Sequence, residues 1–536
     1  MKKFILFLGL LGASVSAQWN PDIETNLEVS SLQVSSSYTA TTSDGKTYVV
    51  FWEENPEFNY RGRVQLLDKD GQKLFGENGI VLNTKAEFST YTQVMDLAVD
   101  SNDDLVVVFY ATGDGIGYTN KISKTGENIW GEEGIVLEPS AMLGKVLPLD
   151  SGVIVGYYKS GKGYITKLNN ETGERLWEEP IVISSPEEGF NFTSVGELAK
   201  YSDDGFIVIL NARKTSFQVS GGSYAQRFTK DGDTVWDNPI KILNSDYVYY
   251  NRRYNKLMDN DVFYIGISAS GINGDKFDAQ LQRINSDGTL PWGANGADFS
   301  DSNYNEIALT ITKIDNHIWG LSTYQKVENF QAYNGEFAQK FDAETGELLF
   351  GESAKEIIPA TSENNLIHTG DIGTLNNQAT FILQSEIDAS VKPTSLILYS
   401  LDENGKIKTN ETITGSTVKS YVNFVSTDDQ AIAIWSDNRE GSPKLYAQNF
   451  VVENLSTDEN QIVKNELKVS PNPFINELII DSKKEIKNNI VYDLTGREVY
   501  RSSNKKLNLG HLTKGVYILK TVLIDGSTNT NKIIKK

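Results

Sequence analysis

The sequence predicts an all-β protein in which a large β-propeller is followed by a small Ig-like β-sandwich. A segment of about 55 residues recurs along most of the chain, and its copies consist of short β-branched and aromatic runs bounded by Asp, Asn and Gly. Such runs are typical of strands joined by tight turns, and a four-stranded unit of this length matches one propeller blade. Near the C-terminus the strand-like runs continue, but the repeat stops and the charge changes sign.

The composition excludes several classes of function. The 536 residues include 71 acidic and 50 basic side chains, and the resulting net charge of −21 repels the phosphates of nucleic acids. The chain has no cysteine, which excludes disulfides, thiolate metal sites and thiol catalysis, and its three histidines leave few imidazole ligands or bases. We therefore expect no nucleic-acid partner.

The first residues resemble an export signal. Lys2 and Lys3 precede an apolar run from Phe4 to Val15, which is followed by the small residues Ser16 and Ala17. The run is shorter than the roughly 20 residues that a membrane-spanning helix needs. We predict a signal peptide at residues 1–17, cleavage after Ala17 and no transmembrane segment.

Seven glycines mark the repeat. They are separated by 47 to 59 residues, and an aromatic residue follows six of them at the fourth position. We expect each ring to fold over its sheet and fill the wedge between blades. The glycines are Gly71, Gly126, Gly173, Gly232, Gly288, Gly346 and Gly405, and the aromatic residues are Phe75, Trp130, Trp177, Trp236, Trp292 and Phe350, with Thr409 at the seventh position.

The number of blades follows from the two ends of the repeat region. The last unit, from Tyr421 to Val452, is one strand short, whereas residues 27–30 form a spare strand before the first unit. Pairing the two segments closes the ring and removes a free sheet edge. We favour eight blades over residues 18–452, with seven as the alternative.

A second domain follows the polar linker at residues 453–465. Residues 466–536 contain 13 basic and 7 acidic side chains, whereas residues 18–452 contain 34 and 61. Short strand-like runs recur here at regular spacing, and Asp493 to Gly496 has the composition of a hairpin turn. These features predict a small β-sandwich.

Four ordered motifs in this domain resemble the type A C-terminal sorting domain of the type IX secretion system of Bacteroidetes. The resemblance implies that the type IX machinery is a partner, that the sorting domain is removed, and that the protein is secreted or held on the outer cell surface. The residues that carry it are Pro471, Asn472 and Pro473, then Gly496, then Gly515 and Tyr517, and finally Lys535 and Lys536.

The propeller repeat resembles that of quinoprotein (PQQ-like) propellers, in which a Thr-Gly turn leads to a docking aromatic residue. Asp342 to Phe350 and Asn170 to Trp177 match this pattern best. Quinoprotein dehydrogenases place a vicinal disulfide over the quinone, which this chain cannot form. The resemblance therefore concerns architecture. We predict no cofactor: pyrroloquinoline quinone is disfavoured, and calcium stays open.

Candidate ligand-binding residues lie at equivalent strand ends. Aromatic faces beside carboxylates stack on sugars or hold cations. The residues chosen on this basis are Trp52, Glu53, Tyr110, Trp435 and Asp437, and further candidates are Tyr157, Tyr158 and the group Tyr247, Tyr249, Tyr250, Arg252, Arg253 and Tyr254.

Sequence motifs for catalysis are weak. His317 and His368 follow turn-like residues, His511 lies in the sorting domain, and the chain has no Gly-x-Ser-x-Gly motif. Asp100 to Asp104 lacks the glycine of an EF-hand loop, so we interpret it as a hairpin turn.

These patterns favour a non-catalytic binding module for a glycan or a protein. The alternative is an extracellular carbohydrate-active enzyme that uses paired carboxylates, which lie roughly 5 to 10 Å apart in glycosidases. Such a pair cannot be chosen from the sequence, because the propeller alone has 61 acidic residues.

Overall fold

The computed structural model describes residues 19–450 and 467–536, apart from 21, 89–91, 216–220, 245–253, 271–275, 329–330, 363–366, 387–392, 414, 416, 428, 483–484, 494–496 and 525–527. The chain divides into two compact units, Met1–Val452 and Glu453–Lys536. The predicted signal peptide, most of the tyrosine-rich group at residues 247–254 and the predicted linker lie outside the described residues.

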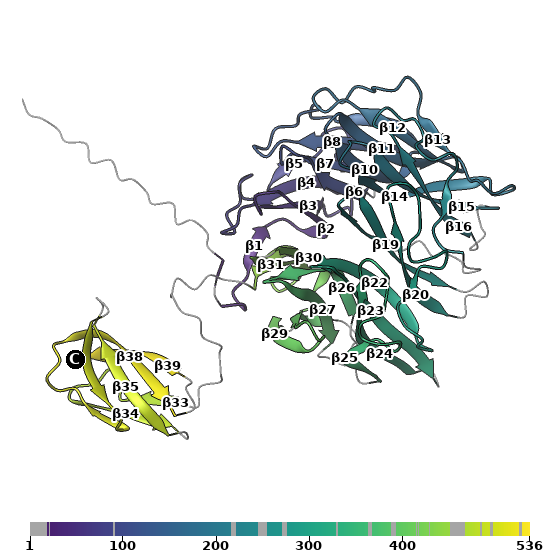
Figure 1. Ribbon diagram of the computed structural model, residues 1–536. Helices are drawn as coiled ribbons and strands as arrows, with labels where there is room; N and C mark the ends of the chain where they lie inside the picture. Colours follow the sequence, from purple (N-terminus) through teal and green to yellow (C-terminus); the bar gives the residue numbers. More distant parts are fainter. Residues whose placement is uncertain are drawn as a thin grey trace, which may run out of the picture. The chain divides into compact units, whose positions relative to one another are not determined.

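The described part of the first unit consists of eight four-stranded antiparallel sheets, which are the blades of a β-propeller (Figure 1). Blades 1 to 4 comprise β2 (Val34–Thr41), β3 (Thr47–Glu54), β4 (Tyr60–Leu67) and β5 (Ile80–Val81); β6 (Thr92–Val99), β7 (Leu105–Ala111), β8 (Ile116–Ile122) and β9 (Ile135–Pro139); β10 (Met142–Leu149), β11 (Gly152–Lys159), β12 (Lys162–Leu168) and β13 (Ile181–Ile183); and β14 (Phe192–Lys200), β15 (Phe206–Arg213), β16 (Gly221–Phe228) and β17 (Ile240–Lys241).

Blades 5 to 8 repeat this order. They comprise β18 (Tyr254–Asp259), β19 (Val262–Ser270), β20 (Phe277–Ile284) and β21 (Ala297–Asp298); β22 (Asn305–Ile314), β23 (His317–Glu328), β24 (Gln331–Asp342) and β25 (Lys355–Thr361); β26 (Ile367–Leu375), β27 (Gln378–Glu386), β28 (Pro393–Leu401) and β29 (Ile407–Ile413); and β30 (Ser420–Thr427), β31 (Gln430–Asp437) and β32 (Lys444–Asn449) with β1 (Leu27–Ser30).

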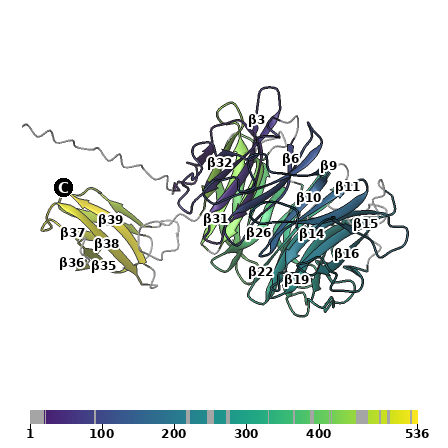
Figure 2. The same ribbon diagram turned by 90° about the horizontal axis from the view of Figure 1, so that it is seen from above.

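The N-terminal strand closes the ring. In blade 8, β1 pairs with β32, with Leu27 opposite Ala447. The first strand of every blade lies beside the first strand of the next, and β30 lies beside β2. The first strands β6, β10 and β14 can be followed in Figure 2. The prediction of eight blades closed by residues 27–30 is confirmed.

The hydrophobic core is divided among the junctions between blades. Eight clusters of buried residues occur in the described part of the propeller, and each joins residues of two neighbouring blades. Because both faces of each sheet are covered, the second strands are continuous apolar runs rather than alternating ones. Val49, Val50 and Phe51 of β3 illustrate this, since all three are fully buried.

The repeated aromatic residue packs on the turn glycine of the following blade. A Cβ atom added to any of the seven glycines would lie 2.9 to 3.2 Å from an atom of that ring. These glycines have φ between +71° and +95°, a region that disfavours other residues. The indole N–H groups of Trp130, Trp236 and Trp292 also donate to carbonyls of the covered turns, at 3.1 to 3.2 Å. The predicted ring therefore fills the wedge between two blades.

Trp19 supplies the aromatic residue for blade 8. Its ring covers Gly71 of blade 1, and its indole N–H donates to the carbonyl of Lys69 at 2.6 Å. Thr409 of blade 7 departs from the pattern because the third strand of blade 8, β32, has no turn glycine after it for a ring to cover. The additional aromatic residue, Trp19, and the missing one, at Thr409, thus both follow from the way the ring closes.

A second set of repeated contacts joins the blades. A basic residue on the third strand of each of blades 2 to 6 donates to a backbone carbonyl in the turn that follows the third strand of the next blade, at 2.8 to 3.2 Å. These residues are Lys121, Lys167, Arg227, Arg283 and Lys340. We call the end of the strands that carries the seven turn glycines the glycine-turn end. Contacts between blades therefore occupy this end.

The second unit is a two-sheet β-sandwich, as predicted. One sheet has the order β33-β34-β37 and the other β36-β35-β38-β39. Phe474, Leu478, Val491 and Leu519 belong to its buried core. The strands are β33 (Leu467–Ser470), β34 (Glu477–Ser482), β35 (Ile486–Tyr492), β36 (Glu498–Ser502), β37 (Lys506–Asn508), β38 (Gly515–Leu523) and β39 (Thr528–Lys535). Among the described residues, no helix has the length and apolar character needed to cross a membrane.

Candidate functional site

The sequence-predicted ligand residues lie on the second strands of blades 8, 1 and 2, at the end opposite the glycine turns. Trp52 is 2% exposed and packs edge-on against Phe109 of the next blade, with ring centroids 5.8 Å apart. Trp435 is fully buried, and Tyr157 is 1% exposed. The position of these rings in the repeat was predicted, but the rings belong to the core between blades and present no face to solvent.

Glu53 lies within a group of charged side chains on blade 1. Its carboxylate accepts from Arg61 at 2.7 Å and from Arg63 at 2.6 Å, and Arg61 also pairs with Glu87. Burial opposes ionisation of Glu53, but Arg63 and Arg61 outweigh it and lower the pKa of the carboxyl group. The Arg61 guanidinium lies 4.5 Å from the ring centre of Phe88. Arg61 is thereby held in one orientation while its side chain stays 17% exposed.

Asp437 ends the second strand of blade 8, one position further along that strand than Glu53 on blade 1. It is 2% exposed and accepts from the indole N–H of Trp435 at 3.0 Å and from Nε of Arg439 at 2.8 Å. Burial works against ionisation of Asp437, but these donors lower its pKa. Arg439 lies 4.1 Å from the ring centre of Tyr446 and keeps 31% of its side chain exposed. Tyr110, on blade 2, is partly buried.

The histidines do not form a catalytic group in the described structure. His317 begins β23 directly after a turn, and His511 lies near Tyr500 in the sandwich, with ring centroids 5.8 Å apart. His368 lies in β26, and its side chain is outside the described part.

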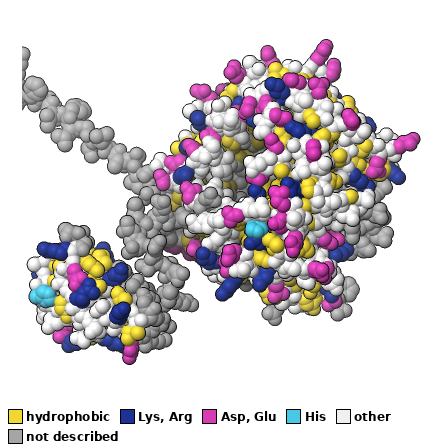
Figure 3. Space-filling model, in the orientation of Figure 1, with side chains coloured by type: hydrophobic (Ala, Val, Ile, Leu, Met, Phe, Trp, Pro, Cys, Tyr) yellow, Lys and Arg dark blue, Asp and Glu magenta, His cyan; other side chains and the backbone are white. Residues whose placement is uncertain are grey.

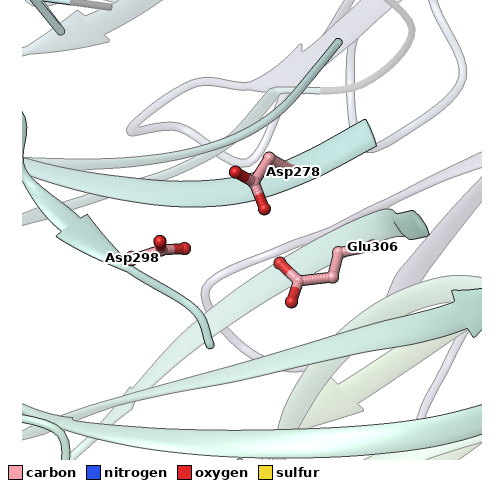
Figure 4. Close-up of side chains that lie close together, drawn as sticks. All are labelled: Asp278, Asp298 and Glu306. Atoms are coloured by element: carbon pink, nitrogen blue, oxygen red, sulfur yellow. The ribbon is translucent and has the colours of Figure 1, made fainter. Parts of the chain in front are cut away.

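Three carboxylates meet at the junction of blades 5 and 6, again at the end opposite the glycine turns (Figure 4). Asp278 comes from β20, Asp298 from β21 and Glu306 from β22, and one oxygen of each lies within 4.8 Å of the others. Asp278 and Glu306 are buried, whereas Asp298 is exposed. We call these three residues the carboxylate cluster.

Neighbouring groups hold the cluster in place. Glu306 accepts from the backbone N–H of Ala279 at 3.0 Å and from the hydroxyl of Ser300, to which the Tyr324 hydroxyl donates. Lys276 approaches Asp278 at 3.1 Å. Glu306 is thus fixed between the third strand of blade 5 and the connection into blade 6.

Burial and mutual repulsion perturb the acids of the cluster. Burial raises the pKa of Glu306 to about 7, and the charges of Asp278 and Asp298 add to this effect. Partial desolvation, followed by the charge of Asp278, raises the pKa of Asp298 to about 6. Holding three negative charges in this space is therefore unfavourable without a compensating cation.

The cluster does not fit the carboxylate pair of a glycosidase. Both members of such a pair must reach the substrate, but Glu306 is fully buried and its oxygens accept hydrogen bonds from the protein. The repeat does not point to the cluster, because its members lie on three strands and occupy no repeated position. The one available signal was that Asp278 and Glu306 are charged residues on strands that the pattern predicts to be buried.

A second buried charge network runs along the first strands of blades 2 to 5. Glu197 lies 2.7 Å from both Lys145 and Lys256, and Asp96 accepts from the backbone N–H of Val146 at 3.0 Å. Burial raises the pKa of Asp96, whereas the two lysines outweigh the burial of Glu197 and lower its pKa. Because these charges compensate one another across blade junctions, we assign them to the scaffold.

On the outer surface, acidic and basic side chains are mixed over the visible face (Figure 3).

In the second unit, the predicted sorting motifs come together at the C-terminal strand. Asn472 donates to the carbonyl of Lys532 at 2.7 Å and accepts from the N–H of Ile534 at 2.9 Å. The amine of Lys535 donates to the carbonyl of Ile475, and the N–H of Lys536 donates to that of Phe474. The segment of Pro471 and Pro473 is thereby tied to the basic end of the chain. Gly515 lies opposite Lys535, Tyr517 is 7% exposed, and Gly496 lies outside the described residues.

One curated relative is the endo-acting ulvan lyase of Formosa agariphila, which is 26% identical over 262 residues. The match covers 41% of this chain and 47% of the relative, so the chain spans about half the length of the protein it matches. The matched part of this chain is longer than residues 468–536, so the similarity extends into residues before them.

Two solved structures resemble the propeller weakly. A PL25 ulvan lyase has a TM-score of 0.45 and 9% identity, with 72% of this chain and 97% of that chain covered. The Dos1 propeller has a TM-score of 0.43 and 12% identity, with 81% and 95% covered. These values give no basis for transferring a site or an activity.

The second unit has a direct match. Residues 468–536 match the family described as the secretion system C-terminal sorting domain. The match covers the motifs and the sandwich described above. This protein is therefore cargo of the type IX secretion system, carried by its C-terminal sorting domain to the cell surface or the extracellular space.

Proposed function

We propose that the secreted propeller binds an extracellular polysaccharide without cleaving it. The observation that carries this proposal is the pair of partly exposed guanidinium groups on neighbouring blades, Arg61 and Arg439. Each is held by a buried or half-buried carboxylate and by an aromatic ring. Fixed guanidinium groups donate well-directed hydrogen bonds to sugar hydroxyl, carboxylate or sulfate groups at little entropic cost.

Polysaccharide cleavage is the second candidate. The name of the curated relative, an endo-acting ulvan lyase, favours it. A lyase breaks the bond between C4 and its oxygen after removal of the C5 proton, and it leaves an unsaturated uronate that absorbs ultraviolet light. The carboxylate cluster does not support a hydrolase that uses paired carboxylates, because Glu306 is sealed from solvent.

Binding assays on the full chain distinguish these functions. Calorimetry with ulvan and a panel of neutral and acidic polysaccharides should give at least one ligand, and the ultraviolet absorbance of each mixture should stay constant. Arg61→Gln and Arg439→Gln should each weaken binding about tenfold, the loss of one charge-assisted hydrogen bond.

Arg175→Gln is the matched control. Arg175 also pairs with a carboxylate and has a side chain that is 35% exposed, but its backbone follows the third strand of blade 3 and its guanidinium contacts Leu137 and Glu138 of blade 2, away from blades 1 and 8. The Arg175→Gln variant should leave the affinity for the polysaccharide unchanged. Product release would replace the binding proposal with the lyase, and the absence of binding to every polysaccharide would reject both.

A further inference from the structure

The carboxylate cluster combines three features of a cation site in one place. Asp278, Asp298 and Glu306 offer oxygens within 4.8 Å of one another, and they come from three strands that the fold holds in position. Two of the three side chains are buried, whereas Asp298 faces solvent. An ion could therefore enter past Asp298 and keep water on its exposed side.

Gln280 provides a second, independent indication of a ligand. It is 8% exposed, and its Oε1 atom is buried without a hydrogen-bond partner among the described residues. An unpaired buried amide oxygen is costly and uncommon. Gln280 lies directly opposite Asp298 in the pairing of β20 with β21, and it is two residues from Asp278. Side chains in these relations project from the same face of a sheet, so the amide adjoins the two aspartates.

We propose that Asp278, Asp298 and Glu306, with the amide oxygen of Gln280, form a calcium site between blades 5 and 6. The donors are all carboxylate or amide oxygens, the ligand set that calcium prefers. Calcium binds oxygens at 2.3–2.6 Å, so ligands on opposite sides of the ion are up to about 5 Å apart, in keeping with the spacing of the cluster. Magnesium requires shorter distances and a nearly ideal octahedron. The site is a property of the fold and does not depend on the proposed polysaccharide.

The ion would join two blades. Asp278 and Asp298 belong to blade 5 and Glu306 to blade 6, so bound calcium stabilises this junction and raises Tm. The Lys276 amine lies 3.1 Å from Asp278, so it neutralises part of the negative charge of the cluster and competes with the metal. Removal of its charge should therefore strengthen calcium binding.

The test uses the full chain after treatment with a chelator and dialysis. Calorimetric titration with calcium chloride should give one site with Kd of about 10⁻⁴ to 10⁻³ M, the range of extracellular calcium modules, and magnesium chloride should bind at least tenfold more weakly. Calcium at 10 mM should raise Tm by about 1.5 to 3 °C.

Variants locate the ion. Asp298→Asn and Glu306→Gln should each weaken calcium binding at least tenfold, and Lys276→Gln should strengthen it at least twofold. Asp301→Asn removes one exposed carboxylate from the same connection between blades 5 and 6 and should leave the calcium affinity unchanged. If Glu306→Gln does not fold, Asp298→Asn carries the test, because Asp298 is exposed. Failure of the native chain to bind calcium at 10 mM, or equal affinity in Asp298→Asn, would overturn the proposal.

Discussion

Substitution of Trp236 tests whether the ring on the next blade's glycine holds the propeller together. Trp236 is 8% exposed, packs on Gly288 and donates from Nε1 to the carbonyl of Ser286 at 3.1 Å. Trp236→Ala should therefore cost about 3 to 5 kcal/mol, as other buried Trp→Ala changes do. Trp236→Phe is the matched control, because phenylalanine occupies the same repeat position at Phe75 and Phe350.

The control should be mild for a structural reason. The ring contact with Gly288 is kept, and the Ser286 carbonyl still accepts from Arg227 at 2.8 Å, so the loss is one hydrogen bond of about 1 kcal/mol. For a propeller of about 430 residues the entropy of unfolding is about 0.9 kcal/mol/K. Tm should then fall by about 3 to 6 °C in Trp236→Ala and by about 1 °C in Trp236→Phe.

Thermal and urea unfolding, followed by circular dichroism, measure both variants. Equal losses of stability in the two variants would mean that the indole hydrogen bond, and not the ring contact, stabilises the junction. A loss below 1 kcal/mol in Trp236→Ala would refute the assignment of the ring to the junction between blades 4 and 5.

Three further predictions follow from buried charges and from the domain division. Burial raises the pKa of Glu336 to about 8, so between about pH 4.5 and 8 the folded chain holds a proton that the unfolded chain has lost. The free energy of unfolding should therefore fall as pH rises through this window, by up to about 4 kcal/mol. Urea unfolding at pH 5 and pH 8 should detect this loss in the native chain and not in Glu336→Gln. Lys121 and Asp100 form an ion pair at 2.7 Å with side chains 2% and 5% exposed, so Lys121→Met should cost about 3 to 5 kcal/mol in the same assay, whereas a loss below 1 kcal/mol would contradict the pairing. Deletion of residues 466–536 should leave the unfolding midpoint of the propeller unchanged but keep the protein inside the cell envelope, as fractionation would reveal; normal secretion would refute the sorting assignment.

The repeat could be predicted because the same contact is needed at each junction between blades. Gly288 and its counterparts need positive φ and a flat ring above them, so the two residue types recur at fixed spacing. The partner of each ring was harder to predict, since the ring covers the glycine of the following blade. Trp19 could not be identified from the repeat for the same reason: its role depends on ring closure, which pairs residues as far apart in the sequence as Leu27 and Ala447.

The candidate site was only partly predictable. The residues chosen on blades 1 and 8 lie at strand ends, because equivalent positions in a repeat lie at equivalent depth, and ligand binding by them stays a prediction. The burial of Trp52 and Trp435 was missed, since the exposure of a ring depends on how the neighbouring blade packs against it. The carboxylate cluster could not be assembled from the sequence, because three strands contribute one acid each to a propeller with 61 acidic residues.

The two ends of the propeller strands differ in a way that bears on function. At the glycine-turn end, rings, lysines and arginines repeat from blade to blade, and their donors are already paired with the neighbouring turn. At the opposite end the charged groups do not repeat: Glu53 with Arg61 occurs on blade 1, Asp437 with Arg439 on blade 8, and the carboxylate cluster between blades 5 and 6. A contact needed for closure must recur at every junction, whereas a ligand needs its partners once. Departure from the repeat, rather than agreement with it, is therefore the better guide to where this propeller acts.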